Sequence, residues 1–173
     1  MPDIVTRSIL DHIKLESEIG GYEAADLRAD SILEFYKQTA LLINCQPSNI
    51  AFTASATDSY TRALSSVPFV PGDTILTDCD DFISNQIQFL SIKKTFGINI
   101  ARIKNSPIGG VDLADLEEKL FLLKPKLFAI THIPTNSGLV QPVKEIAEIY
   151  ARYQNHHGDK PGIFWMLVSQ QGK

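Results

Sequence analysis

A run of small and hydroxyl-bearing residues stands at positions 53–58, where the sequence is Thr-Ala-Ser-Ala-Thr-Asp. Small side chains let the backbone curl closely around an anion. At the start of a helix the amides of Ser55, Ala56 and Thr57 would be free to bind it. The helix dipole favours negative charge at the same place. The structural alternative is an ordinary N-cap, in which the side chain of Ser55 or Thr57 caps the helix. The spacing by itself favours that cap over an anion site.

A second polar run follows an apolar segment at positions 77–86, with the sequence Thr-Asp-Cys-Asp-Asp-Phe-Ile-Ser-Asn-Gln. Open α/β sheets bind ligands beyond the carboxyl ends of their strands, so this run is a second candidate site. From the residue types alone, Phe82 is better explained as a core residue and the acidic run as a solvated turn.

A third run, at positions 131–142, has the sequence Thr-His-Ile-Pro-Thr-Asn-Ser-Gly-Leu-Val-Gln-Pro. It also leaves the end of an apolar segment. We interpret His132 as a loop residue with internal hydrogen bonds. His156 and His157 are adjacent in a polar stretch, which is typical of solvent-exposed histidines, so we assign no metal site.

The elements that would position these runs alternate between helix and strand. The apolar run at 127–130 is continuous, as expected for a strand that is covered on both faces. We expect strands at 50–53, 74–77, 98–103, 126–131 and 163–168, and helices at 22–44, 57–66, 83–95, 113–123 and from 142 onward. This order predicts an α/β fold with a mostly parallel sheet flanked by helices.

Composition narrows the classes of partner. A formal net charge of −4 argues against a nucleic-acid or anionic-membrane surface. No apolar run reaches the roughly 18 residues of a membrane span, and the first residues lack the features of a secretory signal. The two cysteines are too few for a disulfide framework. We therefore expect a cytoplasmic protein with reduced thiols, without nucleic-acid or membrane partners.

Together the three runs resemble the cofactor domain of pyridoxal-phosphate enzymes of the class V aminotransferase family, near the cysteine desulfurases and isopenicillin-N-epimerase-like proteins. The 53–58 run is similar to the loop that holds the cofactor phosphate, with Ser55, Ala56 and Thr57 at the matching positions. Phe82 matches the ring that stacks on the pyridine face. Thr135 matches the residue near the cofactor's phenolic oxygen, within the pattern His-x-Pro-Thr-x-x-Gly.

The resemblance implies a fold-type-I large domain over residues 22–173, after an N-terminal segment at 1–21. It also implies pyridoxal 5′-phosphate as cofactor, an amino-acid substrate and a homodimer. The implied chemistry is that of an aminotransferase, an epimerase or a cysteine desulfurase or lyase. The sequence does not choose among these reactions.

The resemblance ends at Ser169, where the family has the aspartate that pairs with the pyridine nitrogen. The family's Schiff-base lysine lies on a later strand, and Lys173 is too near to take that role. We therefore expect a C-terminally incomplete domain, truncated before that lysine, without catalytic residues of its own and inactive as this chain. The alternative is a non-catalytic dimerising or binding remnant of the same fold.

Overall fold

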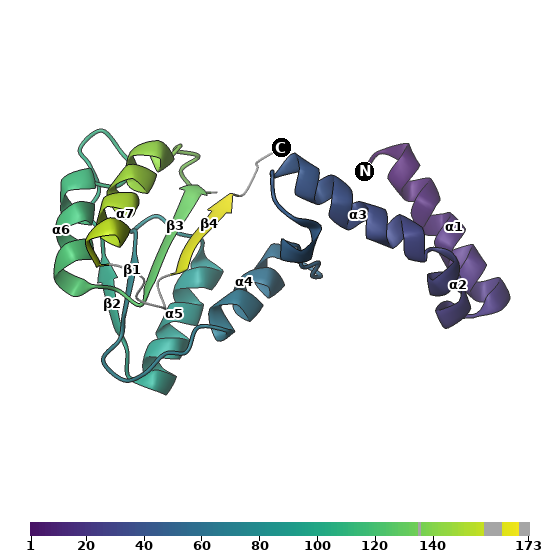
Figure 1. Ribbon diagram of the computed structural model, residues 1–173, viewed down its shortest axis with the longest axis horizontal. Helices are drawn as coiled ribbons and strands as arrows, with labels where there is room; N and C mark the ends of the chain where they lie inside the picture. Colours follow the sequence, from purple (N-terminus) through teal and green to yellow (C-terminus); the bar gives the residue numbers. More distant parts are fainter. Residues whose placement is uncertain (135, 158–163, 170–173) are drawn as a thin grey trace. The chain divides into compact units, whose positions relative to one another are not determined.

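The computed structural model describes residues 1–134, 136–157 and, for the backbone, 164–169 (Figure 1). Contacts divide the chain into two compact units, Met1–Phe52 and Thr53–Lys173. The N-terminal segment expected at residues 1–21 lies inside the first unit. The expected division into that segment and a large domain stays a prediction.

The first unit is helical. It contains α1 (Asp3–Ile19), α2 (Gly21–Leu27), α3 (Ala29–Leu42) and a short 3-10 helix, η1 (Pro47–Asn49). Gly20 separates α1 from α2 with φ 98°, a conformation that favours glycine. The single helix expected at 22–44 is two helices, because the backbone leaves the helical conformation at Arg28 (φ −105°, ψ 6°).

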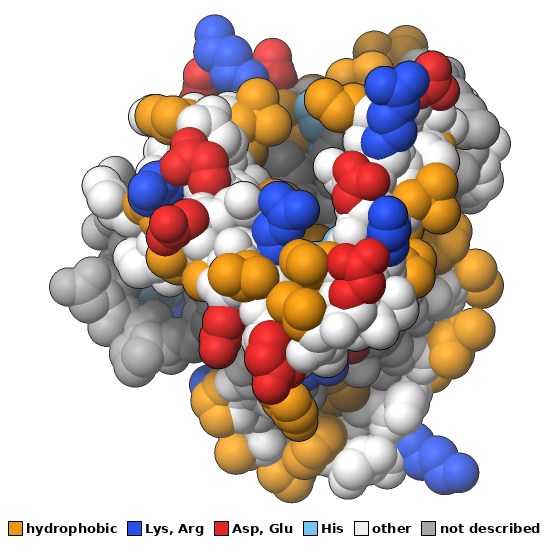
Figure 2. Space-filling model, turned by 90° about the vertical axis from the view of Figure 1, so that its right-hand side faces the viewer, with side chains coloured by type: hydrophobic (Ala, Val, Ile, Leu, Met, Phe, Trp, Pro, Cys, Tyr) orange, Lys and Arg blue, Asp and Glu red, His pale blue; other side chains and the backbone are white. Residues whose placement is uncertain are grey.

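The described apolar residues buried in this unit are Ala24 and Ala40. Larger apolar side chains stay exposed on α1 and α3, among them Ile9, Leu10, Ile13, Leu33, Phe35 and Leu41. Figure 2 shows hydrophobic side chains at the surface, interspersed with charged ones. This unit therefore has a small core of its own.

The buried strand expected at residues 50–53 is absent, so that prediction was wrong. Ile50 is extended (φ −99°, ψ 131°), but no strand of the described sheet pairs with this segment. Phe52 is 70% exposed and makes an edge contact with Phe35, with ring centroids 5.5 Å apart. An extended, apolar segment becomes a strand only when a neighbour satisfies its backbone groups.

The second unit contains a four-stranded sheet made of β1 (Thr74–Thr77), β2 (Asn99–Arg102), β3 (Leu127–Ile133) and β4 (Phe164–Ser169). The strand order is β2-β1-β3-β4, and each neighbouring pair is parallel. The expected α/β fold with a parallel sheet is confirmed. All four carboxyl ends consequently lie at one edge of the sheet.

Helices cover both faces of this sheet (Figure 1). On one face lie α6 (Leu113–Leu123) and α7 (Val143–His157), packed on Leu76 and Phe128. On the other lie α4 (Ala56–Ser65) and α5 (Ile83–Phe96), packed on Ile75 and Leu127. The alternation of side chains along each strand sends neighbouring residues to opposite faces.

The sequence did not specify the end of α7 or the buried face of α5. The helix α7 continues to His157, through the polar stretch that contains the two adjacent histidines. On α5 the buried residues are Asn85 and Phe89, whereas Ile87 and Leu90 are mostly exposed. Apolar residues occur all around α5, so its sequence did not identify the buried face.

Candidate functional site

The start of α4 is a capped helix terminus. The side chain of Ser55 accepts a hydrogen bond from the Asp58 N–H at 3.1 Å, which confirms the N-cap interpretation for Ser55. The Thr53 hydroxyl hydrogen-bonds to the Ser55 carbonyl at 3.1 Å and to the Ser59 hydroxyl. The turn into the helix is therefore fixed by side chains on both sides of Ser55.

The cap leaves donors available to a ligand. Ala56 and Thr57 are the first two residues of α4 and both are exposed. N–H groups at these positions have no acceptor within their own helix. Asp58 is paired with Arg62, with 2.9 Å between Oδ1 and Nε, which offsets its negative charge near the terminus. The terminus can accept an anion as well as carry its cap.

The second run places a carboxylate network at the carboxyl edge of the sheet. Asp81 Oδ1 accepts from the Phe82 N–H at 2.7 Å, from Asn85 Nδ2 at 2.9 Å and from the Thr131 hydroxyl at 2.5 Å. Its Oδ2 accepts from Gln86 Nε2 at 3.2 Å. An ionised carboxylate can only accept hydrogen bonds, and these four donors match it. Phe82, which is half-buried, is held at the N-cap of α5 by this network.

Asp78 follows β1 and has a different environment. It is fully buried, and burial, followed by the charges of Asp81 and Asp80, raises its pKa to about 7. Its Oδ2 accepts from Gln141 Nε2 at 3.3 Å. Near neutral pH the carboxyl of Asp78 therefore retains a proton in a substantial part of the molecules.

Buried oxygens without a hydrogen-bond partner gather near this edge. Within the described part of the chain they include Thr77 Oγ1, Asp78 Oδ1 and the Tyr60 hydroxyl. Burial, followed by the charges of Asp81 and Asp78, raises the pKa of Tyr60. A buried polar group without a hydrogen bond is costly, so these oxygens indicate a place where further hydrogen bonds can form.

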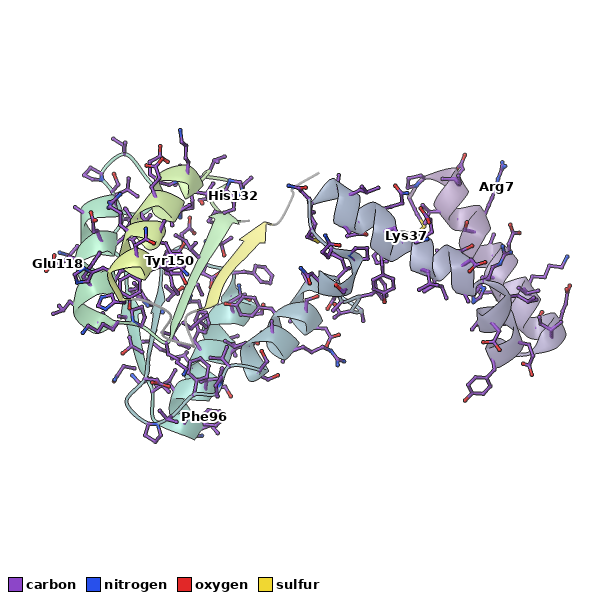
Figure 3. All side chains as sticks on the ribbon, in the orientation of Figure 1. Arg7, Lys37, Phe96, Glu118, His132 and Tyr150 are labelled. Carbon is purple, nitrogen blue, oxygen red and sulfur yellow. The ribbon has the colours of Figure 1, made fainter. Side chains whose placement is uncertain are left out.

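The third run lies beside the second. Its first residue, Thr131, bonds Asp81, and the Ser137 hydroxyl bonds Asp80 Oδ2. His132 is half-buried at the end of β3 (Figure 3), and its carbonyl accepts from the Gln141 N–H at 2.9 Å. Three side-chain contacts, each between residues 50 or more positions apart, therefore join the two runs at Asp81, Asp80 and Asp78.

The expected site residues divide as follows. Ser55, Ala56 and Thr57 lie together at the start of α4, and Phe82 lies at the start of α5. Thr135 lies outside the described residues. Sequence reasoning passed over Asp78 and Gln141 as site residues. The sequence did show one signal for Asp78, namely a carboxyl group directly after a strand. It could not show the partner, because Gln141 is 63 residues away.

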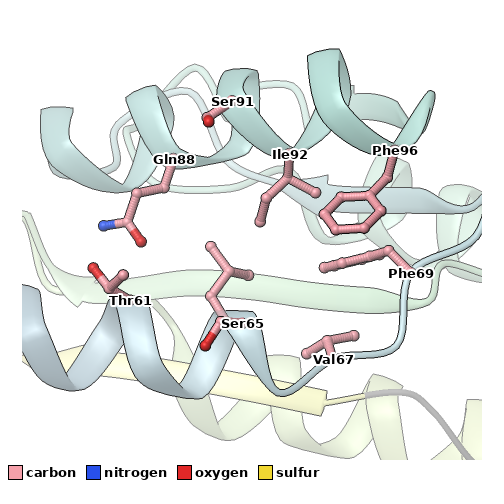
Figure 4. Close-up of a pocket in the computed structure, with 9 residues that line it drawn as sticks. Thr61, Ser65, Val67, Phe69, Gln88, Ser91, Ile92 and Phe96 are labelled. Carbon is pink, nitrogen blue, oxygen red and sulfur yellow. The ribbon is translucent and has the colours of Figure 1, made fainter.

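Other features of the described residues do not join this site. A pocket of about 220 Å³ between α4 and α5 is lined mainly by apolar and hydroxyl side chains and contains none of the expected site residues (Figure 4). The rings of His157 and Tyr153 are in tilted contact, with centroids 4.6 Å apart. No group of three or more His, Cys, Asp or Glu side chains in this part of the chain could hold a metal ion. None of its helices combines the length and apolarity that a membrane crossing requires.

Comparison with known proteins gives a family match. Residues 16–156 match the model of the family described as aminotransferase class-V. The chain is 26% identical over 132 residues to a probable cysteine desulfurase of Pyrococcus abyssi, covering 75% of this chain and 32% of that protein. It is 30% identical over 134 residues to a NifS/IcsS protein homolog of Lactobacillus delbrueckii subsp. bulgaricus, covering 75% of this chain and 34% of that protein.

Solved structures show the same fold. The cystine C-S lyase C-DES, in complex with its product cysteine persulfide, superposes with a TM-score of 0.83 at 20% identity, covering 96% of this chain and 44% of that chain. The apo cysteine desulfurase of Thermococcus onnurineus NA1 superposes with a TM-score of 0.72 at 20% identity, covering 83% and 34%. The chain therefore spans about a third of the length of the curated relatives.

Proposed function

The chain belongs to the class-V aminotransferase family, and we propose that residues 53–142 form the cofactor-facing part of a pyridoxal-phosphate-dependent enzyme that acts on an amino acid. The observation that carries this proposal is the meeting of the 77–86 and 131–142 runs at the carboxyl edge of a parallel sheet, through Asp81 and Thr131. Ligands of open α/β sheets bind beyond that edge.

Two features of the described residues fit pyridoxal phosphate. The amides of Ala56 and Thr57 stand at a helix terminus, where a phosphate is favoured. The backbone N–H of Phe82 donates to Asp81 Oδ1 at 2.7 Å, and this hydrogen bond fixes the backbone position from which the ring extends. When bound, pyridoxal phosphate supplies an electron sink for charge that develops at the α-carbon of an amino acid.

The protein's own residues then have separate roles. Ser55, Ala56 and Thr57 bind the phosphate with backbone and hydroxyl donors. Phe82 covers one face of the ring and excludes water from it. Thr135 is proposed to contact the phenolic oxygen, from the match of its motif. No residue of this chain is assigned to proton transfer.

The substrate class follows from the relatives. The curated relatives are named as cysteine desulfurases or as a NifS/IcsS homolog, so we favour a cysteine-type amino acid over transamination or epimerisation of another amino acid. We also propose a cytoplasmic homodimer. The exposed apolar side chains of α1 and α3 favour a partner surface, and they equally support the alternative function of a dimerising or binding module.

The test is binding of pyridoxamine 5′-phosphate to the full chain, measured by calorimetry. This ligand lacks the carbonyl that reacts with surface lysines. We expect saturable binding, at least about tenfold tighter than that of pyridoxamine, because charge-assisted hydrogen bonds to the phosphate are worth roughly 1.5–3 kcal/mol. Inorganic phosphate should compete. Equal affinity for both ligands would contradict the proposal.

A further inference from the structure

One buried side chain connects three segments at the carboxyl edge. Gln141 is 2% exposed and donates from Nε2 to Asp78 Oδ2 at 3.3 Å. Its Oε1 accepts from the Val111 N–H at 3.0 Å, and its backbone N–H donates to the His132 carbonyl at 2.9 Å. The end of β1, the turn before α6 and the 131–142 run all meet at this residue.

The orientation of the Gln141 amide follows from its partners. The Val111 N–H can only donate, so the amide oxygen faces it and the amide nitrogen faces Asp78. Gly110 also lies close to the amide oxygen of Gln141. A Cβ on Gly110, which has φ +75°, would lie 3.0 Å from Gln141 Oε1. Gly110 therefore leaves space for the amide oxygen that a larger residue would take up.

Asp78 is poorly prepared to carry a charge. It is fully buried, and its Oδ1 has no hydrogen-bond partner among the described residues. The acidic groups that act on it are Asp81 and Asp80 on its own loop, and the Tyr60 hydroxyl of α4 lies within their field. The backbone amides of Asp80 and Thr131 act in the opposite direction, and the pKa of Asp78 is about 7.

We propose that Gln141 is a positioning residue that holds the 131–142 run against the end of β1, and that this hold is firm while Asp78 carries its proton. When Asp78 ionises, a second carboxylate beside Asp81 has to be hydrated, and opening of the 139–142 segment admits the water. The bearing on cofactor binding rests on the function proposed above, since the run that is held begins with Thr131, which bonds Asp81, and contains His132.

Amide hydrogen exchange of the full chain tests the hold without any cofactor. After correction for intrinsic exchange rates, protection of the Val111 and Gln141 amides should fall by up to tenfold per pH unit as pH rises from about 4 to about 7, and should level off above pH 7. The Leu116 amide, bonded to Asp112 at 2.9 Å within α6, serves as an internal reference and should keep its protection.

Two variants separate this hold from a general packing effect. Asp78→Asn is a neutral isostere of the protonated acid and should remove the pH dependence, whereas Asp80→Asn, two residues away and less buried, should retain it. Gln141→Ala should lower protection of Val111 at every pH, and Gln88→Ala on α5 should not. If Asp78→Asn keeps the pH dependence of the parent, the proposal is overturned. That comparison also decides the matter where Gln141→Ala fails to fold.

Binding of pyridoxamine 5′-phosphate distinguishes the hold from the proposed function. We expect Gln141→Ala to weaken this binding several-fold and Gln88→Ala to leave it unchanged. If the exchange results are as expected while Gln141→Ala binds like the parent, the hold is confirmed and its role in the cofactor site is overturned. Absence of binding in the parent, with the exchange results intact, would refute the function and leave the hold established.

Discussion

At the scale of single residues, Asp78 and Asp81 show how position decides the behaviour of a carboxyl group. They lie three positions apart at the same edge of the sheet. Asp81 accepts from four donors, and Asp78 has one side-chain donor and an oxygen without a partner. Burial, followed by the charges of Asp81 and Asp80, therefore raises the pKa of Asp78.

The proton on Asp78 makes stability depend on pH. The folded pKa, about 7, lies above the ordinary value of 3.8, so the folded state holds a proton that the unfolded state releases between these values. Stability from this group is present below about pH 4 and is lost as pH rises toward 7. We expect Asp78→Asn to gain stability over the parent by roughly 2–4 kcal/mol between pH 4.5 and pH 7.5. Urea unfolding at both pH values measures this difference, and a constant difference would contradict it.

Thr57 is the residue that separates a phosphate site from a simple cap, because Ser55 already makes the cap. We expect Thr57→Ala to weaken binding of pyridoxamine 5′-phosphate by about 1.5 kcal/mol or more, the value of one charge-assisted hydrogen bond. Calorimetric titration measures it. Thr61→Ala, one turn further along the exposed side of α4, is the matched control and should bind like the parent. A change of less than about twofold for Thr57→Ala would make Thr57 only a helix residue.

At the scale of elements, local signals predicted the helices and strands well where neighbours in sequence supply the interactions. The cap at Ser55 depends on an atom three residues away, and the continuous apolar run of β3 reflects burial on both faces. The segment at 50–53 carried the same apolar signal but became no strand. The sequence of this segment favours an extended backbone. It does not indicate whether a partner strand is present.

Hydrogen exchange should show this difference between two apolar segments. Amides of residues 127–131 lie in β3, which is paired on both sides, whereas Phe52 is 70% exposed and its segment is unpaired. We expect the amides of 50–53 to exchange at least about a hundredfold faster than those of 127–131. Equal strong protection in a dilute sample would mean that residues 50–53 pair with a strand after all.

At the scale of the whole molecule, the two units differ in how they bury apolar surface. The sheet unit has a core on each face, while the helical unit buries two alanines and exposes large side chains of α1 and α3. Exposed apolar surface of this kind is typical of an interaction site. We therefore predict that the proposed homodimer associates through the helical unit.

Self-association should therefore depend on the helical unit. We expect sedimentation velocity to show dimers at micromolar concentration, and Leu33→Ser together with Phe35→Ser to shift the equilibrium toward monomer by at least about tenfold. Val70→Ser, an equally exposed change in the sheet unit, is the control and should leave association unchanged. A parent chain that is monomeric at 100-fold higher concentration would argue against a homodimer.

By itself, the sequence determined the alternation of helices and strands, the family and the runs that face the carboxyl edge, because these depend on residue types, spacing and close neighbours. Tertiary structure alone decided which polar groups meet there. Asp78 and Gln141 are 63 residues apart, and Asp81 and Thr131 are 50 apart. Parallel pairing of β1 with β3 brings these ends together, and burial of Asp78 then raises its pKa. A hydrogen bond or a desolvated charge is a property of a place in three dimensions, and no local pattern encodes it.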